Sequence, residues 1–200
     1  RQKPAASILV STGMVKKGQA DASVTMGSTG AAMAAASVVL GVIEGIDRPA
    51  LGGPIIGLAP RTMIIDVGTN VDCRPGQLLG FAVIGDVFAR QFWGLKRPRV
   101  GLLSVGTEAD KGNRQVRETS ELLERSGLNF VGNLEAHDLL RHHAEVVVCD
   151  GFVGNIVMKL TEGLGYAMAE YIREELKDDL SSPKLDQLAQ KVFELSNPAE

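Results

Sequence analysis

The sequence predicts an α/β fold, in which a mostly parallel sheet carries helices on both faces and the chain ends in a helical hairpin. Short runs rich in β-branched residues alternate along the chain with longer segments of helical periodicity. The 23 glycines cluster just after the apolar runs, as they do where strands end in tight loops. Strands that alternate with helices form right-handed βαβ units, so their strands are expected to lie parallel.

The first quarter of the chain shows one apolar run between two helical segments. Residues 7–17 have helical spacing and end at Gly18, a typical C-terminal stop. Residues 22–26 are expected to form a short strand that leads into an alanine-rich helix at residues 31–43. Residues 51–57 are rich in Gly and Pro, which predicts a loop with a weak strand.

The middle of the chain carries the firmest alternation. Residues 62–67 are β-branched and predict a strand, which a long apolar helix follows at residues 76–93. A second strand is expected at residues 100–105, an amphipathic helix at residues 114–125 and a third strand at residues 129–131. This order is typical of a sheet with crossover helices.

The last quarter ends in helices. A short helix at residues 136–141 precedes the last strand, which is expected at residues 145–149. Helical periodicity then covers residues 153–177 and 183–195, with a hinge at residues 178–182.

Length and composition fit one large globular domain or two small ones. We expect an α/β core over residues 1–152 and a helical hairpin of the same domain over residues 153–200. The net charge of −3 gives no sign of a nucleic-acid partner, and no apolar run approaches the roughly 18 residues of a membrane span. Cys73 and Cys149 make neither a disulfide framework nor a zinc quartet, which favours a reduced, cytoplasmic setting.

Four of the expected strands end in loops of similar chemistry. The loops are residues 26–30, 66–70, 105–113 and 149–155; each has glycines and a short polar side chain, and three have an aspartate. In parallel sheets, ligands bind beyond the carboxyl ends of the strands. The repetition of this pattern favours a ligand site over four unrelated turns.

The first of these loops opens a helix. Free backbone N–H groups at Gly27, Ser28, Thr29 and Gly30, together with the helix dipole, predict a seat for an anion such as phosphate. The loop is not G-x-G-x-x-G, and no G-x-x-x-x-G-K-[ST] occurs in the chain, so dinucleotide and P-loop chemistry lose support. The alternative is a tight turn with no ligand.

Several polar side chains of the other loops are candidates for chemistry, and each has a plainer alternative. Lys111 lies in a loop after a strand, where a solvated lysine is the alternative. Asn155 lies at a helix start, where the alternative is an N-cap. Asp66 and Asp150 end strands, and such residues more often brace loop amides than perform chemistry.

The histidines and cysteines support no catalytic triad. His137, His142 and His143 lie on or near one short helix and are expected to be solvated. Cys73 has no histidine beside it in sequence, and Cys149 is expected in the core. No spacing typical of metal ligands is recognised, so no metal is expected.

Several motifs together resemble the bacterial phosphate acyltransferase family (PlsX), over nearly all 200 residues. The motifs are Asp66-Val-Gly-Thr-Asn-Val-Asp-Cys73, Lys111-Gly-Asn113, Asn129-Phe-Val-Gly-Asn-Leu-Glu135, Val146-Val-Val-Cys-Asp-Gly-Phe-Val-Gly-Asn155, Gly27-Ser-Thr-Gly-Ala31 and Gly45-Ile-Asp-Arg-Pro49. Ser28 stands where the family usually has Asn. Family members are also considerably longer, so the chain looks like a central fragment of the family's full length.

The resemblance implies transfer of a long acyl chain from acyl carrier protein to inorganic phosphate, which gives an acyl phosphate for phospholipid (phosphatidic acid) synthesis. It also implies a fold like those of phosphate acetyltransferase and isopropylmalate dehydrogenase, a homodimer, and peripheral contact with the inner face of the membrane, without a cofactor. Two alternatives stay open: a phosphate acetyltransferase-like enzyme that uses acyl-coenzyme A, and a non-enzymatic regulator on the same scaffold.

This chemistry suggests roles for the candidate residues. Phosphate is already anionic at neutral pH, so the site needs an anion seat, donors for the thioester oxyanion and exclusion of water. Lys111 and Asn155 are expected to be catalytic, and residues 27–30 are expected to bind phosphate. The expected substrate-binding residues are Asp66, Asn70, Asp150 and Gly154.

A basic segment is the candidate contact for an acidic carrier protein. Residues 90–117 hold seven basic and two acidic side chains, and Lys96, Arg97 and Arg99 lie together just before a strand. Complementary charge steers association. The alternative is a solvated basic face.

Overall fold

The computed structural model describes residues 6–178 and 180–196, which fall into two compact units, residues 1–49 and 50–200. Each unit is described by itself. The first holds α1 (Ser7–Lys16) and α2 (Thr29–Val39), which pack on each other. Both helices were expected, although α2 begins two residues earlier and ends four residues earlier than the pattern indicated.

The strand expected at residues 22–26 is wrong. These residues form no regular structure, and the side chains of Val24 and Met26 are 91% and 103% exposed. A strand needs a neighbour to satisfy its backbone N–H and C=O groups. The described residues of the first unit contain no strand, so this apolar run has no strand to pair with there.

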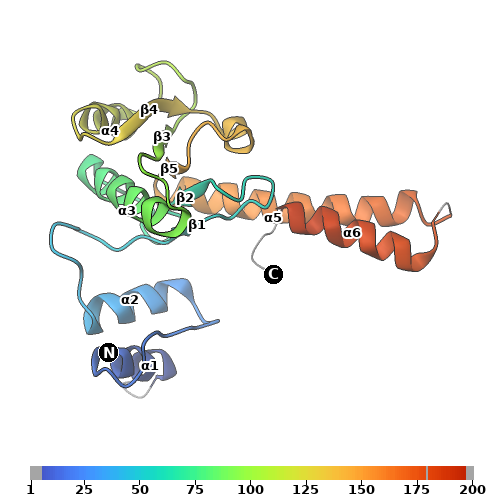
Figure 1. The fold of residues 1–200 in the computed structure, drawn as a ribbon, viewed down its shortest axis with the longest axis horizontal. Helices are drawn as coiled ribbons and strands as arrows, with labels where there is room; N and C mark the ends of the chain where they lie inside the picture. Colours follow the sequence, from blue (N-terminus) through green and yellow to red (C-terminus); the bar gives the residue numbers. More distant parts are fainter. Residues whose placement is uncertain (1–5, 179, 197–200) are drawn as a thin grey trace. The chain divides into compact units, whose positions relative to one another are not determined.

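The second unit is built on one five-stranded sheet (Figure 1). In spatial order the strands are β1 (Gly52–Gly53), β2 (Met63–Ile65), β5 (Val146–Val148), β3 (Arg99–Leu103) and β4 (Asn129–Leu134). β1 runs antiparallel to β2, and the other three pairings are parallel. The predicted mostly parallel α/β sheet is therefore confirmed.

Helices cover both faces of this sheet. Ile65 and Val148 belong to a core shared with α3 (Pro75–Trp93) and α4 (Arg114–Glu124). Their neighbours Ile64 and Val147 belong to a second core, which includes η1 (Ala136–Arg141), a 3₁₀ helix, and the start of α5 (Gly151–Glu175). Because successive strand residues point to opposite faces, a continuous apolar run such as residues 146–148 is what a sheet buried on both sides requires.

Local signals explain where the helices begin and end. α3 has Pro at its first position and ends at Gly94, whose φ of 67° is the left-handed conformation that glycine adopts readily. The Asn113 side chain accepts a hydrogen bond from the Val116 amide at 2.9 Å and caps α4. Asp150 caps α5 in the same way, through the Val153 amide at 2.9 Å.

The chain closes with α5 and α6 (Ser182–Ser196), which lie side by side (Figure 1). Small residues at Gly165, Ala169 and Ala189 are buried between them, and the rings of Tyr166 and Phe193 lie 4.7 Å apart. Asp179 of the expected hinge lies outside the described residues, and the division at residue 152 stays a prediction. Among the described residues, no helix has the length and apolar character to cross a bilayer.

Candidate functional site

The carboxyl ends of β2, β5 and β3 lie at one edge of the sheet, because these strands are parallel and in register. Ile65 is opposite Val148, and Val148 is opposite Leu102. The residues that follow, Asp66 after β2 and Asp150 after β5, therefore emerge side by side. This edge is where the candidate residues of the second unit gather.

Asp66 organises the loop after β2. Its carboxylate is fully buried, and Oδ1 accepts hydrogen bonds from the amides of Leu51, Gly68 and Thr69 at 3.4, 3.2 and 3.1 Å. Oδ2 accepts from the backbone N and the side-chain Nδ2 of Asn70 at 2.7 and 2.8 Å. With five protein donors on two oxygens, this carboxylate is occupied in shaping the loop and in orienting the Asn70 amide.

The N-terminus of α5 packs directly on this loop. The Gly151 amide donates to the Asn70 carbonyl oxygen at 2.7 Å. A Cβ added to Gly154 would lie 1.9 Å from the Asp66 carbonyl oxygen, so only glycine allows this approach. A Cβ on Gly68 would lie 3.2 Å from Asn155 Oδ1, so the Asn155 side chain lies over Gly68. The structure thus brings Asp66, Asn70, Asp150, Gly154 and Asn155 together.

These contacts decide between the alternative roles at the helix start. Asp150 is the N-cap of α5, so Asn155, five residues into the helix, is not. The Asn155 side chain is exposed beside the loop, where its amide can donate to a ligand. Asp150 accepts from the Val153 amide, so part of its hydrogen-bonding capacity serves the helix.

Lys111 is exposed in the loop that follows β3 at the same edge. The loop is held by hydrogen bonds to the Glu108 carbonyl oxygen, from Asn133 Nδ2 at 2.9 Å and from the Lys111 amide at 3.1 Å. The stem of Lys111 lies against Gly106, where a Cβ would be 2.9 Å from Lys111 Cγ. Its ammonium group is therefore presented on a hydrogen-bonded loop at the same edge of the sheet.

Two buried hydroxyl groups at this edge were not anticipated from the sequence. Thr69 Oγ1 and Ser104 Oγ are buried and have no hydrogen-bond partner among the described residues. Thr69 lies next to Asn70, and Ser104 Oγ lies under Gly112, the neighbour of Lys111. Serine and threonine are common in loops, and no spacing in the sequence distinguishes a buried hydroxyl of this kind from an ordinary loop residue.

The expected anion seat lies in the other compact unit. Gly27, Ser28, Thr29 and Gly30 are exposed, and Ser28 is the N-cap of α2 without a side-chain hydrogen bond to the helix. The Gly27 amide donates to Thr25 Oγ1 at 3.1 Å. The loop therefore does open a helix, but it does not follow a strand. Its grouping with the strand ends of the second unit stays a prediction.

The basic segment is divided between the two ends of β3. Lys96, Arg97 and Arg99 come before or at the start of the strand, and Arg99 pairs with Glu145 at 2.6 Å. Lys111 and Arg114 follow its carboxyl end. The cluster expected to steer a carrier protein therefore lies at the edge opposite Lys111.

Both thiols support the β2 loop from inside. Cys73 Sγ donates to the Asn70 carbonyl oxygen at 3.2 Å, and Cys149 Sγ to that of Asp66 at 3.4 Å. Burial, and then the charges of Asp150 and Asp66, raise the pKa of the Cys149 thiol far above its ordinary value. A protonated, buried thiol is a poor nucleophile, so Cys149 belongs to the core.

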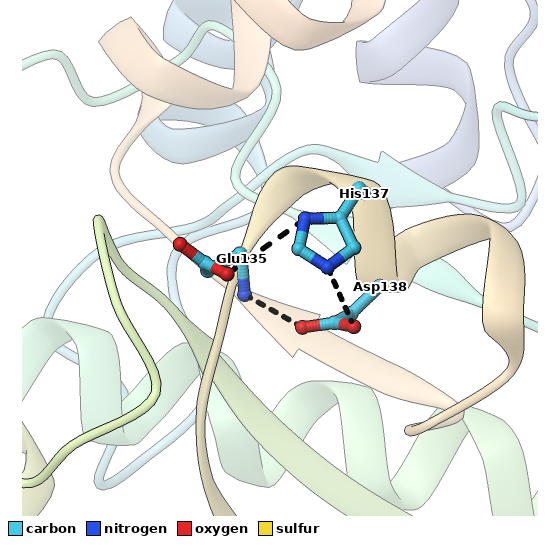
Figure 2. Close-up of side chains that lie close together, drawn as sticks. All are labelled: Glu135, His137 and Asp138. Carbon is cyan, nitrogen blue, oxygen red and sulfur yellow. Dashed lines mark hydrogen bonds and ion pairs between the residues drawn. The ribbon is translucent and has the colours of Figure 1, made fainter.

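A third group of side chains offers metal-ligand chemistry. Glu135, His137 and Asp138 converge where the chain leaves β4 and enters η1 (Figure 2). Glu135 and Asp138 form a capping box, in which each carboxylate accepts a hydrogen bond from the other residue's backbone amide. The three histidines are exposed, as expected.

Comparisons with known proteins identify relatives over most of the chain. A family model described as "Fatty acid synthesis protein" matches residues 1–197. The phosphate acyltransferase of Pelotomaculum thermopropionicum is 48% identical over 176 residues, which are 88% of this chain and 52% of the relative. The phosphate acyltransferase of Geotalea uraniireducens is 45% identical over 193 residues, 96% of this chain and 56% of the relative. The chain thus spans about half the length of these curated relatives.

Solved structures agree on the fold. A phosphotransacetylase from Streptococcus pyogenes superposes with a TM-score of 0.61 at 20% identity, covering 78% of this chain and 54% of that chain. The chain therefore has an α/β fold like that of this phosphotransacetylase. The chain belongs to the fatty acid synthesis protein family, and its resemblance to the bacterial phosphate acyltransferases is confirmed.

Proposed function

We propose that the protein transfers an acyl group from a thioester of acyl carrier protein to inorganic phosphate. The product is an acyl phosphate that supplies phospholipid synthesis. The observation that carries this proposal is the direct packing of the α5 N-terminus on the Asp66 loop, because it joins two of the motifs shared with phosphate acyltransferases into one site.

The reaction needs few proton transfers. An oxygen of hydrogen phosphate attacks the thioester carbonyl carbon and a tetrahedral oxyanion forms. The carbon–sulfur bond then breaks, and the proton of the phosphate passes to the leaving sulfur, which gives the acyl phosphate and the carrier thiol. Asn155, exposed beside Gly68, donates to the oxyanion, and Lys111 neutralises charge on phosphate or oxyanion. Asn70, Asp150 and Gly154 shape the substrate contact.

The loop of residues 27–30 is proposed as a phosphate seat because its amides lie at the start of α2. We also propose a cytoplasmic homodimer with peripheral contact to the inner face of the membrane. Exposed apolar side chains along α5, which protein contacts commonly cover, support the dimer. They are Phe152, Ile156, Leu160, Leu164 and Met168.

The test is thioester consumption by the protein expressed from its complete gene. Acyl carrier protein and acyl-coenzyme A thioesters are supplied in parallel, with and without phosphate, and acyl phosphate is measured. Phosphate-dependent consumption of the carrier-bound substrate is expected. Preference for acyl-coenzyme A would support the acetyltransferase-like alternative, and no turnover by a folded protein would support the regulator.

Lys111→Ala in the same assay tests the assigned role. Loss of one charge that stabilises a transition state lowers kcat by roughly 10²–10³-fold. Lys191→Ala, an exposed lysine of α6, is the matched control and should keep full activity. Equal rates for both variants would remove Lys111 from the mechanism.

A further inference from the structure

The motif that forms β4 has no role yet in the proposed reaction, and this strand is irregular. Val100 of β3 is opposite Phe130 of β4. Two residues further along β3, Leu102 is opposite Asn133, which lies three residues further along β4. The extra residue makes a β-bulge, and Gly132 lies in it with a φ of 96°, a conformation that glycine adopts readily.

The bulge decides to which face of the sheet Asn133 points. In a regular strand, side chains three residues apart point to opposite faces. Phe130 packs against the core that the sheet shares with α3 and α4, so a regular strand would direct residue 133 away from that core. Because of the bulge, Asn133 instead shares a face with Leu102, which belongs to the same core. Asn133 is buried there, with 5% of its surface exposed.

In this position the Asn133 amide bonds to the turn that carries Lys111. Asn133 Nδ2 donates to the Glu108 carbonyl oxygen at 2.9 Å. The Lys111 amide donates to the same oxygen at 3.1 Å, which closes a four-residue turn. One carbonyl oxygen therefore connects the buried side chain of β4 with the backbone of Lys111.

The other end of this loop is bonded to α4. Arg117 Nη1 donates to the Gly112 carbonyl oxygen at 3.1 Å, and Asn113 caps the helix. Both contacts come after Lys111 in the chain, whereas residues 107–110 before it are exposed. An exposed turn keeps its position through the few bonds that it makes, so the bond from Asn133 is expected to limit how far Lys111 moves.

We infer that Asn133 is a positioning residue for Lys111, and that the bulge at Gly132 directs it to this task. The inference rests on the proposed function, in which Lys111 neutralises charge on phosphate or oxyanion. Displacement of a reacting group by about 1 Å can slow a reaction about 10²-fold, so a side chain that fixes the Lys111 turn affects the rate without touching substrate. Bulges next to active sites commonly redirect a side chain in this way.

The experiment compares Asn133→Leu with Asn129→Leu in the protein expressed from its complete gene. Asn129 is the matched control, because its Nδ2 donates to the Arg97 carbonyl oxygen at 3.1 Å at the other end of the same strand. Asn133→Leu also removes the buried Oδ1, which has no partner among the described residues, so the variant should fold. It should lower kcat roughly 10–100-fold and leave the KM for the carrier thioester within about twofold, whereas Asn129→Leu should keep the wild-type kcat.

Two further measurements separate positioning of Lys111 from a general effect on the fold. In the Lys111→Ala background, Asn133→Leu should lower kcat no further, because Asn133 acts through Lys111. Tryptic cleavage after Lys111, followed by mass spectrometry without substrates, should be several-fold faster in Asn133→Leu than in Asn129→Leu. Equal cleavage of the two variants, or a full second loss of kcat in the Lys111→Ala background, would overturn the inference. Absence of turnover by the wild-type protein would instead overturn the proposed function, so the two failures are distinguishable.

Discussion

At the scale of single residues, Asp66 is the side chain on which the candidate site depends. Its two oxygens accept five hydrogen bonds from Leu51, Gly68, Thr69 and Asn70. A buried carboxylate with this many donors serves as a fixed centre for the loop. We therefore interpret Asp66 as positioning Asn70 and the α5 contact, although the sequence motif suggested that it binds substrate.

Asp66→Asn tests this interpretation. An amide can accept on one oxygen only, so its NH₂ group would face at least two N–H donors, and the free energy of unfolding should fall by about 3 kcal/mol. Asp150→Asn is the matched control, because Asn is an equally good N-cap, and it should cost less than about 0.5 kcal/mol. Urea denaturation of both variants measures the difference. Equal stabilities would show that the Asp66 charge is not needed for the loop.

At the scale of elements, the sequence predicted the order and type of nearly every helix and strand of the second unit. β-branched runs such as residues 146–148 have few alternatives to a buried strand. The error at residues 22–26 has a physical cause, because a strand depends on a partner that local sequence does not reveal. The sequence also did not reveal which residues of the site contact one another. Gly154 is 88 positions from Asp66, and only the folded chain shows why a side chain there is forbidden.

Gly154→Ala and Gly163→Ala place the same substitution at two points of α5. At Gly154 the new methyl group would meet the Asp66 carbonyl oxygen, so α5 must shift, and the free energy of unfolding should fall by about 3 kcal/mol or more. At Gly163 nothing lies within 4 Å, so alanine should stabilise the helix by about 0.5–1 kcal/mol. Thermal unfolding compares the two variants. Loss of stability at both positions would mean that the packing of α5 elsewhere, and not its close approach to the Asp66 carbonyl oxygen, determines the loss of free energy of unfolding.

At the scale of the whole molecule, the arrangement of charge matters more than its sum. The net charge is −3, yet residues 90–117 carry a net charge of +5, and β3 separates these basic side chains into two groups. Five residues of strand place the groups roughly 13 Å apart. A carrier protein that delivers its thioester to the Lys111 edge would therefore meet Arg114 before it meets Arg97.

Arg114→Glu and Arg97→Glu distinguish the two edges. The Arg114 side chain is 84% exposed and, among the residues that the structure describes, pairs with Glu118 of its own helix, so charge reversal should leave stability nearly unchanged. At low salt it should raise the apparent KM for acyl carrier protein thioester several-fold, since steering acts through complementary charge, whereas Arg97→Glu should have little effect. The difference should shrink at high salt, where charges beyond a few ångströms are screened, and it should vanish for a small uncharged thioester. A larger effect of Arg97→Glu would place the carrier protein at the opposite edge of the sheet, and with it the entry path of the acyl group.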